Sequence, residues 1–148
     1  QSEEYWHVFA QLAGGSPPEF QAKLAKKGKN AAKIENEEGV CSTYFINLHC
    51  EFYNPLEESQ ARLIRLILDL GHQIGVHFDA AFYNITLESD INEHLSYEAQ
   101  LLEHFFGIQP KAFSFHNPSE FLLTCDAKEY GGLFNCYSKY TQFGRKLF

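Results

Sequence analysis

The stretch GHQIGVHFDAAFY, residues 71–83, decides the fold of this 148-residue chain. Apart from two histidines, a glutamine and an aspartate, it consists of apolar or aromatic residues and glycine, and that pattern is typical of a strand buried in a sheet. Side chains alternate between the two faces of a strand, so His77 and Asp79 share one face and Phe78 takes the other. The stretch therefore predicts a strand over residues 72–79 with two polar groups near its carboxyl end.

Helical and strand-like patterns alternate on both sides of this strand. Apolar residues at helical spacing, followed by a glycine, indicate helices, whereas runs of β-branched and aromatic residues indicate strands. Residues 120–148 are aromatic without clear periodicity, and no element is assigned to them. The expected elements are a helix over 19–39, a strand over 40–50, a helix over 58–71, the strand over 72–79, a loop over 80–90, a helix over 91–107 and a strand over 111–119.

Alternating helices and strands with short connections predict the fold class: α/β, with a parallel sheet and covering helices. A globular chain of this length forms one domain by the usual prior, and residues 20–148 are expected to be that single α/β domain. Glycine and proline at residues 14–18 break regular structure, so residues 1–19 are expected to be a loosely attached N-terminal segment.

Composition and charge narrow the classes of function. Twelve Lys and Arg against nineteen Asp and Glu give a net charge of −7, which repels phosphate backbones, so no nucleic-acid partner is expected. No apolar run approaches the roughly 20 residues of a transmembrane helix, and the N-terminus lacks an export signal. The four cysteines show no metal-binding spacing, which suits reduced thiols. A cytoplasmic location is expected.

Polar residues gather where three of the expected strands end: NLHC at 47–50, VHFD at 76–79 and FHNPS at 115–119. The carboxyl ends of parallel strands meet at one edge of a sheet, and ligands bind at that edge. Two imidazoles and a carboxylate there suit zinc or another borderline divalent metal, which takes nitrogen and oxygen ligands and leaves a position open for water. The sequence thus predicts a metal site that includes His77 and His116.

Other readings of these residues stay open. A histidine near a strand end is also typical of a hydrogen-bonded structural residue. His72 is expected to pack or cap the helix-to-strand turn, and His94 and His104 to lie at the surface or in a second layer. Cys50, beside His49, is a candidate nucleophile. The chain has no P-loop, no G-x-G-x-x-G after a strand and no G-x-S-x-G, so the usual marks of nucleotide binding and serine hydrolysis are missing.

Three segments together resemble a known family: STYFINLHCEFYNP at 42–55, LGHQIGVHFD at 70–79 and AFSFHNPS at 112–119. In this order, with a helix between each pair, they are similar to the polysaccharide deacetylase (NodB-homology) family. The similarity is greatest to members with an F-S-F-H-N-P segment, some of which are associated with lipopolysaccharide or O-antigen synthesis. GHQIGVH matches the family's GHEIG-x-H with Gln73 in place of Glu. The resemblance covers residues 31–140.

The resemblance implies a deformed, partly open (β/α) barrel and a metal-dependent hydrolase that removes N- or O-acetyl groups from a sugar or glycolipid. The implied metal is a divalent ion, zinc in the first place. His77 falls on the first metal histidine, and His116 lies in the motif that lines the pocket and is expected to be a second ligand. Asp79 is expected to serve as the catalytic base, and it is also a possible substitute for the metal ligand that is missing at position 81. The expected substrate-binding residues are Asn47, His49 and Asn117.

The chain also departs from the family pattern. The family has a second metal histidine four positions after the first, where this chain has Ala81. The aspartate pair of the family's first strand has no counterpart before residue 31, and its late general-acid histidine motif has none before Phe148. A full barrel runs to about 250 residues, so residues 20–148 are expected to be an incomplete barrel, either a fragment of one or a degenerate relative. The alternative function is therefore a catalytically inactive carbohydrate-binding or structural relative.

Overall fold

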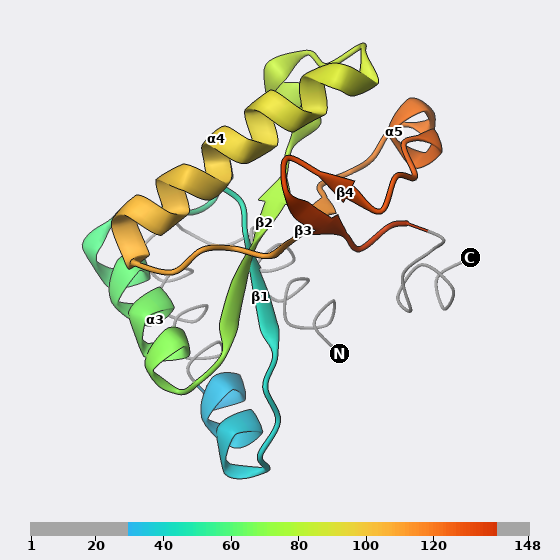
Figure 1. Cartoon of the computed structure of the whole chain (residues 1–148). Coiled ribbons are helices and arrows are strands. Elements are labelled where there is room, and N and C mark those ends of the chain that lie inside the picture. Colours follow the sequence, from blue (N-terminus) through green and yellow to red (C-terminus); the bar gives the residue numbers. More distant parts are fainter. Residues whose placement is uncertain (1–29, 139–148) are drawn as a thin grey trace. The chain divides into compact units, whose positions relative to one another are not determined.

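The computed structural model describes residues 30–138 (Figure 1). The expected segment 1–19, the expected helical residues 19–29 and the unassigned residues 139–148 lie outside the described residues. Residues 30–37 are helical, as expected. The further elements are β1 (Thr43–Ile46), α3 (Glu58–Asp69), β2 (Gln73–Phe78), the 3-10 helix η1 (Ala80–Tyr83), α4 (Glu88–Phe106), β3 (Ala112–Phe115), α5 (Glu120–Thr124), β4 (Glu129–Tyr130) and β5 (Leu133–Asn135).

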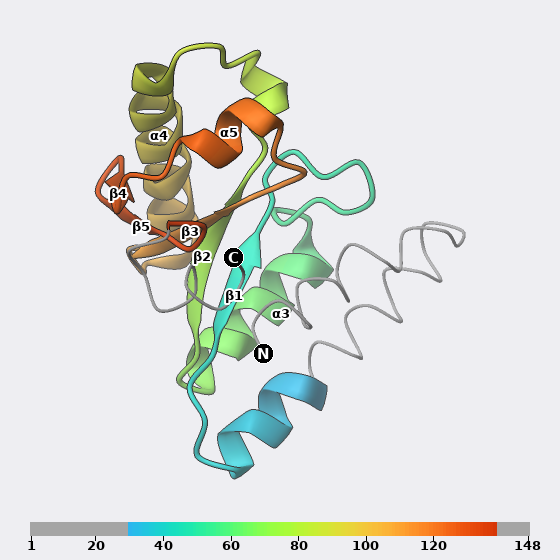
Figure 2. The same cartoon turned by 90° about the vertical axis from the view of Figure 1, so that its right-hand side faces the viewer.

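The strands form one five-stranded sheet in the order β1-β2-β3-β5-β4. β2 pairs with β3 in parallel, β3 pairs with β5 in parallel, and β4 pairs with β5 in the antiparallel direction. The mixed α/β class with a mostly parallel sheet is therefore confirmed (Figure 2). Among the described residues the sheet is an open row of strands, and its closure into a barrel stays a prediction.

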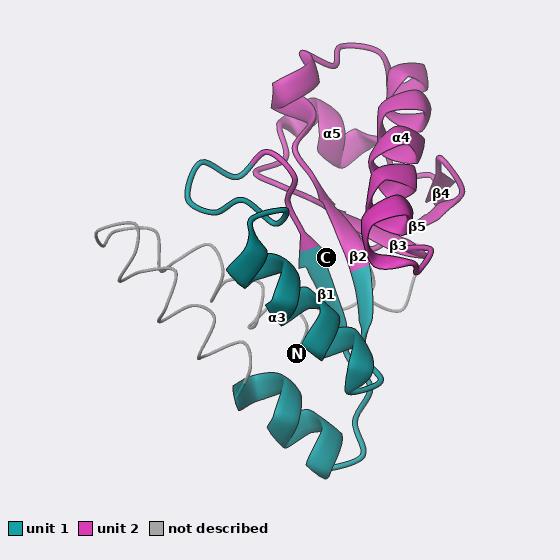
Figure 3. Ribbon diagram, turned by 90° about the vertical axis from the view of Figure 1, so that its left-hand side faces the viewer, with its two compact units in different colours: residues 1–45, 50–74 teal, residues 46–49, 75–148 magenta. Residues whose placement is uncertain are grey.

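The chain divides into two compact units, and β1 and β2 each pass from one into the other (Figure 3). Unit 1 comprises residues 1–45 and 50–74, and unit 2 comprises residues 46–49 and 75–148. Every residue of the predicted site lies in unit 2.

Unit 1 is built on the apolar face of α3. Leu63 and Ile67 lie one turn apart on that helix and pack with Tyr44 of β1 and with Tyr53. Full burial of a side chain such as Ile67 contributes about 1.5–3 kcal/mol. The first turn is capped by the Glu57 carboxylate, which accepts the backbone N–H of Ser59 at 3.1 Å. The helix over these residues matches the prediction closely.

His72 holds the junction between α3 and β2. It is 2% exposed, and both ring nitrogens bind backbone groups. Nδ1 accepts the N–H of Ser42 at 3.1 Å, so Nε2 carries the proton and donates to the carbonyl of Ala32 at 2.8 Å. The expected structural role of this histidine at the turn is confirmed.

Unit 2 packs α4 beside β2 and β3. The register brings Phe78 of β2 level with Phe115 of β3, and both side chains are at most 1% exposed. From the helix, Ile91, Leu95 and Leu102 are fully buried. The helix begins at Glu88, three positions before the expected 91, and it ends at Gly107, whose φ of 69° suits glycine.

The segments left unassigned or expected to be a loop contain short elements. Residues 80–90, expected as a loop, begin with η1 because the Asp79 carboxylate caps it by accepting the N–H of Ala81. β5 extends the parallel sheet, and β4 folds back on it through Gly131. Gly131 has a φ of 57°, and a Cβ there would lie 2.9 Å from the carbonyl oxygen of Asn92. That turn therefore depends on glycine to approach α4 closely.

Candidate functional site

His77 and His116 meet at the carboxyl ends of β2 and β3. Nε2 of His77 lies 3.2 Å from Nδ1 of His116, and the two rings pack edge to face with centroids 5.2 Å apart. His77 is 2% exposed, and its Nδ1 lies 2.7 Å from the hydroxyl oxygen of Ser114. Ser114 is level with His77 in the parallel register, which explains why the two side chains share a face. The structure thus brings together the two expected metal ligands.

Asn117 contributes a further hydrogen bond to this pair. Its Nδ2 lies 3.2 Å from Nε2 of His116 and can only donate, so Nε2 accepts. The His116 proton is then on Nδ1 and is donated to Nε2 of His77, whose own Nδ1–H is donated to Ser114. The backbone N–H of His116 donates to the carbonyl of Phe78 at 2.8 Å and anchors the loop after β3.

The distance between the two imidazole nitrogens is also close to that between two ligands of one metal ion. Two nitrogen ligands at about 2.0–2.1 Å from a tetrahedral zinc ion lie about 3.3–3.4 Å apart, close to the 3.2 Å observed. Rotation of the Asn117 amide by half a turn would present its oxygen to Nε2 of His116, which moves the proton there and leaves a lone pair on Nδ1. Within residues 30–138 no third His, Cys, Asp or Glu joins the pair. The metal role of His77 and His116 stays a prediction.

Asp79 and Ala81 lie in the turn that follows β2. Asp79 is half-buried, and its Oδ1 accepts the backbone N–H of Ala81 at 3.2 Å. Asp79 is therefore placed as the cap of η1, with its second carboxylate oxygen left for other partners. Its role as catalytic base stays a prediction.

A second cluster surrounds His49 in the same unit. Its Nε2 lies 3.0 Å from the hydroxyl of Tyr83 and 3.2 Å from Oε2 of Glu98. The ring stacks on Phe82 with centroids 3.6 Å apart and an interplanar angle of 12°. Asn47, which is 2% exposed, accepts the backbone N–H of His49 at 2.9 Å and so fixes the loop. Asn47 therefore acts on this cluster through His49.

Glu98 is the buried charge of this cluster. Its side chain is fully buried on α4, and Oε2 accepts the hydroxyl of Tyr83 at 2.5 Å. Oε1 has no hydrogen-bond partner among residues 30–138. Burial raises the pKa of Glu98 to about 7, with a smaller contribution from the charge of Asp79, while the bond from Tyr83 opposes the shift. A carboxyl of this kind exchanges its proton near neutral pH.

The same surroundings shift the pKa values of Tyr83 and His49. Tyr83 lies between the rings of Phe78 and His94, with centroid distances of 5.7 and 4.1 Å. Burial and the neighbouring Glu98 raise the pKa of Tyr83, so its hydroxyl stays protonated. Burial lowers the pKa of His49, and the charge of Asp79 partly offsets this, so the imidazole is neutral at pH 7.

Four residues of these clusters were missed in the sequence: Ser114, Phe82, Tyr83 and Glu98. Glu98 lies on the apolar face of α4 together with Leu95 and Leu102, and a carboxylate at a core position is a signal that could have identified it. Ser114 is the polar residue of an otherwise apolar strand and lies two positions before His116. Residues two apart in a strand share a face, and this spacing could have identified Ser114. Tyr83 gave no such signal, because its segment was expected to be a loop.

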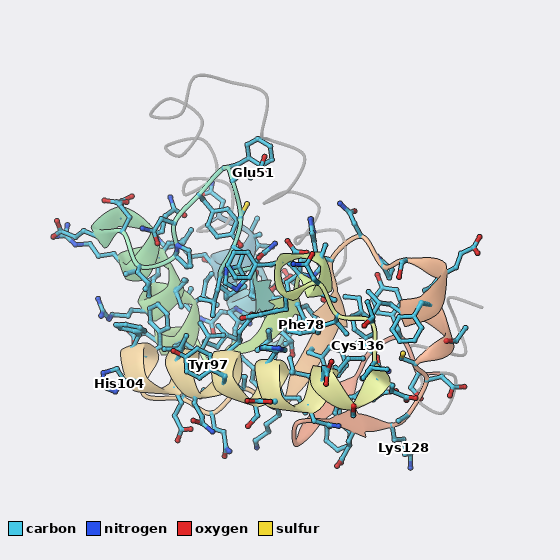
Figure 4. All side chains as sticks on the ribbon, turned by 90° about the horizontal axis from the view of Figure 1, so that it is seen from above. Glu51, Phe78, Tyr97, His104, Lys128 and Cys136 are labelled. Atoms are coloured by element: carbon cyan, nitrogen blue, oxygen red, sulfur yellow. The ribbon has the colours of Figure 1, made fainter. Side chains whose placement is uncertain are left out.

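Cys50 is poorly suited to act as a nucleophile. Its thiol is half-buried, and burial raises its pKa, so the reactive thiolate is scarce at neutral pH. His94 is half-buried in a second layer against Tyr83, and His104 is exposed at the C-terminal end of α4, as expected (Figure 4).

No family model matches the chain, and neither the curated proteins nor the solved structures include a significant match to it. The resemblance to the deacetylases therefore depends on its three sequence segments. Within residues 30–138 no helix is both long and apolar enough to cross a bilayer.

Proposed function

We propose that this chain carries part of the active-site rim of a metal-dependent hydrolase that removes N- or O-acetyl groups from a sugar or glycolipid precursor. One observation supports this most: Nε2 of His77 and Nδ1 of His116 lie 3.2 Å apart where two adjacent parallel strands end. This is the edge at which α/β enzymes bind their substrates. The two imidazoles would hold a divalent ion, zinc in the first place.

Neighbouring side chains prepare the two imidazoles for that role. The bond from His77 Nδ1 to Ser114 fixes the ring, so that Nε2 faces His116. Partners of this kind orient metal-binding histidines and raise their basicity. Asn117 sets which nitrogen of His116 carries the proton, through the orientation of its amide. Further ligands are required, from water, from substrate or from residues outside 30–138.

The proposed reaction divides its tasks among residues of unit 2. Zinc at the two imidazoles would polarise the acetyl carbonyl and lower the pKa of the attacking water. Asp79, which follows β2, would accept the proton of that water. Asn117 is exposed beside His116 and would bond a hydroxyl or acetyl oxygen of the substrate. His49, which is half-buried in the loop after β1, would make a second contact with the substrate.

The alternative is a protein that binds a sugar without removing its acetyl groups. Phe82 favours this alternative, because 58% of it is exposed and it is stacked on His49. Sugar rings commonly pack on such aromatic faces, and binding needs no third metal ligand. Under this alternative Phe82→Ala would abolish sugar binding, and acetate release would be absent from the unaltered protein.

The deciding experiment measures metal content and acetate release on the same preparations. Purified protein would be dialysed against zinc or cobalt chloride, its bound metal counted, and acetate release followed from triacetylchitotriose and from an O-acetylated xylan. His77→Gln and His116→Gln keep the size of the side chain but remove the imidazole. His104→Gln, on the exposed side of α4, is the matched control.

We expect about one metal ion per chain. His77→Gln and His116→Gln should each lower both metal affinity and acetate release by about tenfold or more. His104→Gln should leave both unchanged. Metal content at background in the unaltered protein, or acetate release that is equal in His77→Gln and the unaltered protein, would contradict the proposed function.

A further inference from the structure

We propose that His49, Glu98 and Tyr83 form a proton relay in which His49 is the general acid that protonates the leaving nitrogen or oxygen of the acetylated substrate. This inference rests on the proposed deacetylase function. His49 is half-buried, and the charge of Asp79 acts on it, which places its imidazole near the proposed catalytic base. In this proposal His49 is the catalytic residue, and Glu98 and Tyr83 are positioning residues that act through it.

The relay is built from a fully buried carboxyl and a partly exposed imidazole. Nε2 of His49 lies 3.2 Å from Oε2 of Glu98, and the side chains are 20% and 0% exposed. The other ring nitrogen, Nδ1, has no hydrogen-bond partner among residues 30–138. A carboxyl on one nitrogen and a free position on the other is the arrangement of an acid–base histidine.

Glu98 is also arranged to hold its proton toward His49. Its Oε1 is buried and has no partner within residues 30–138, so a carboxyl proton there would lack an acceptor. On the Oε2 side the proton can be donated to Nε2 of His49, while Tyr83 donates its own hydroxyl to the same oxygen. The rings of Phe78 and His94 hold Tyr83 in place.

The titratable groups around Glu98 are consistent with proton exchange near neutral pH. His49 faces it from the loop after β1, Tyr83 from η1, and the charge of Asp79 acts on both Glu98 and His49. His94, on the same helix, contacts Tyr83. Burial holds the pKa of Glu98 at about 7 and lowers that of His49, so a neutral carboxyl beside a neutral imidazole is well populated at pH 7.

The proton steps balance. As the C–N or C–O bond of the substrate breaks, the proton on Nδ1 of His49 moves to the leaving atom, and Nε2 takes the carboxyl proton of Glu98. The resulting carboxylate accepts hydrogen bonds from Tyr83 and from the new Nε2–H. A proton taken up from solvent at Nδ1 then recharges Glu98 through Nε2, while the proton of the attacking water leaves through Asp79.

The test compares substrates that need a general acid with one that does not. p-Nitrophenolate leaves without protonation, whereas 4-methoxyphenolate and the amine of triacetylchitotriose leave poorly. His49→Gln should lower kcat for the two poor leaving groups by about a hundredfold and should leave p-nitrophenyl acetate within about twofold. His77→Gln should slow all three substrates, because it acts on the proposed metal.

Glu98→Gln tests the stored proton, with Glu103→Gln, an exposed carboxylate of α4, as its control. The amide oxygen can still accept from Tyr83 and His49, so the ring stays oriented, but no proton can be released. We expect a fall in kcat without a rise in KM, and loss of the inflection near pH 7 that Glu98 gives the rate profile. Tyr83→Phe should shift that inflection to higher pH, because it removes a bond that lowers the pKa of Glu98.

Ring ¹⁵N chemical shifts of His49 provide a readout that needs no catalysis. In the unaltered protein the proton should move from Nδ1 to Nε2 as pH rises through about 7, and this change should vanish in Glu98→Gln. If acetate release is absent altogether, the proposed function fails, and a missing tautomer change in this titration overturns the relay as well. If His77→Gln is inactive but His49→Gln keeps its full rate on triacetylchitotriose, the relay alone is wrong.

Discussion

His72 directly precedes β2, and His77 lies near the carboxyl end of that strand. Both are 2% exposed, yet their hydrogen bonds are of different kinds. His72, in unit 1, binds a backbone N–H on one ring nitrogen and a backbone carbonyl on the other. His77, in unit 2, binds the side chains of Ser114 and His116. Backbone groups have fixed donor and acceptor roles, whereas a hydroxyl and an imidazole can exchange theirs.

The difference shows how one strand uses the same residue type in two ways. Fixed partners at the amino end hold His72 in one tautomer and make it part of the core. Exchangeable partners at the carboxyl end would let His77 take a second state, such as the proposed metal-bound one, without leaving a buried group unpaired. Burial alone therefore does not separate a histidine with fixed backbone partners from one with exchangeable side-chain partners.

The largest expected effect is the loss of stability in His72→Ala. This change removes a buried ring and leaves the N–H of Ser42 and the carbonyl of Ala32 without their partner, which together should cost about 4 kcal/mol. His77→Ala should cost about 2 kcal/mol less, because its side-chain partners can rotate toward others. Urea unfolding measures both, with exposed His104→Ala as the control. Equal losses of stability in His72→Ala and His77→Ala would contradict the distinction between fixed and exchangeable partners.

The next effect is a dependence of stability on pH that Glu98 introduces into unit 2. The pKa of Glu98 is raised from 4.5 to about 7 in the folded protein, so between these values the folded chain keeps a proton that the unfolded chain has lost. Its contribution is therefore full below pH 4.5 and declines as pH rises through 7, by up to about 3 kcal/mol. The lowered pKa of His49 acts in the opposite direction, below its usual value of 6.5.

Glu98→Gln isolates the pH-dependent contribution of Glu98 to stability, because glutamine resembles the protonated acid at every pH. The variant should match the unaltered protein in urea unfolding near pH 4.5 and should be more stable at pH 8, with Glu103→Gln unchanged at both. A Glu98→Gln protein that loses stability in parallel with the unaltered protein between pH 4.5 and 8 would show that the carboxyl does not keep its proton.

Periodicity and strand alternation were enough to predict most of the fold and the meeting of two site histidines. α3, β2 and β3 follow from local patterns, and His77 and His116 meet because both lie where parallel strands end. Glu98 was not predicted, because its buried place results from packing on α4. The short β4 and β5 carry too few residues for a period, and their pairing depends on tertiary contacts with β3 and α4.

A smaller effect is expected for Ser114→Ala, which tests the partner of His77. The change removes the hydroxyl at 2.7 Å from Nδ1 and should lower stability by about 1–2 kcal/mol. The affinity of zinc for the His77/His116 pair should also fall by about tenfold or more, because His77 loses the bond that fixes its ring. Ser89→Ala, at an exposed position of α4, is the control. Unchanged metal affinity would mean that Ser114 serves only the fold.

The smallest effect on stability should come from Asn117→Gly. Asn117 is exposed with a φ of 42°, a conformation that glycine adopts at no steric cost, so urea unfolding should change by less than about 0.5 kcal/mol. Its amide is nevertheless the group that sets the proton on His116. The ring ¹⁵N shifts of His116 should therefore show a mixture of tautomers in the variant, although the fold is unaffected. If the tautomer of His116 is unchanged, His77 and not the Asn117 amide determines which nitrogen carries the proton. The partners of His116 would then be as fixed as those of His72.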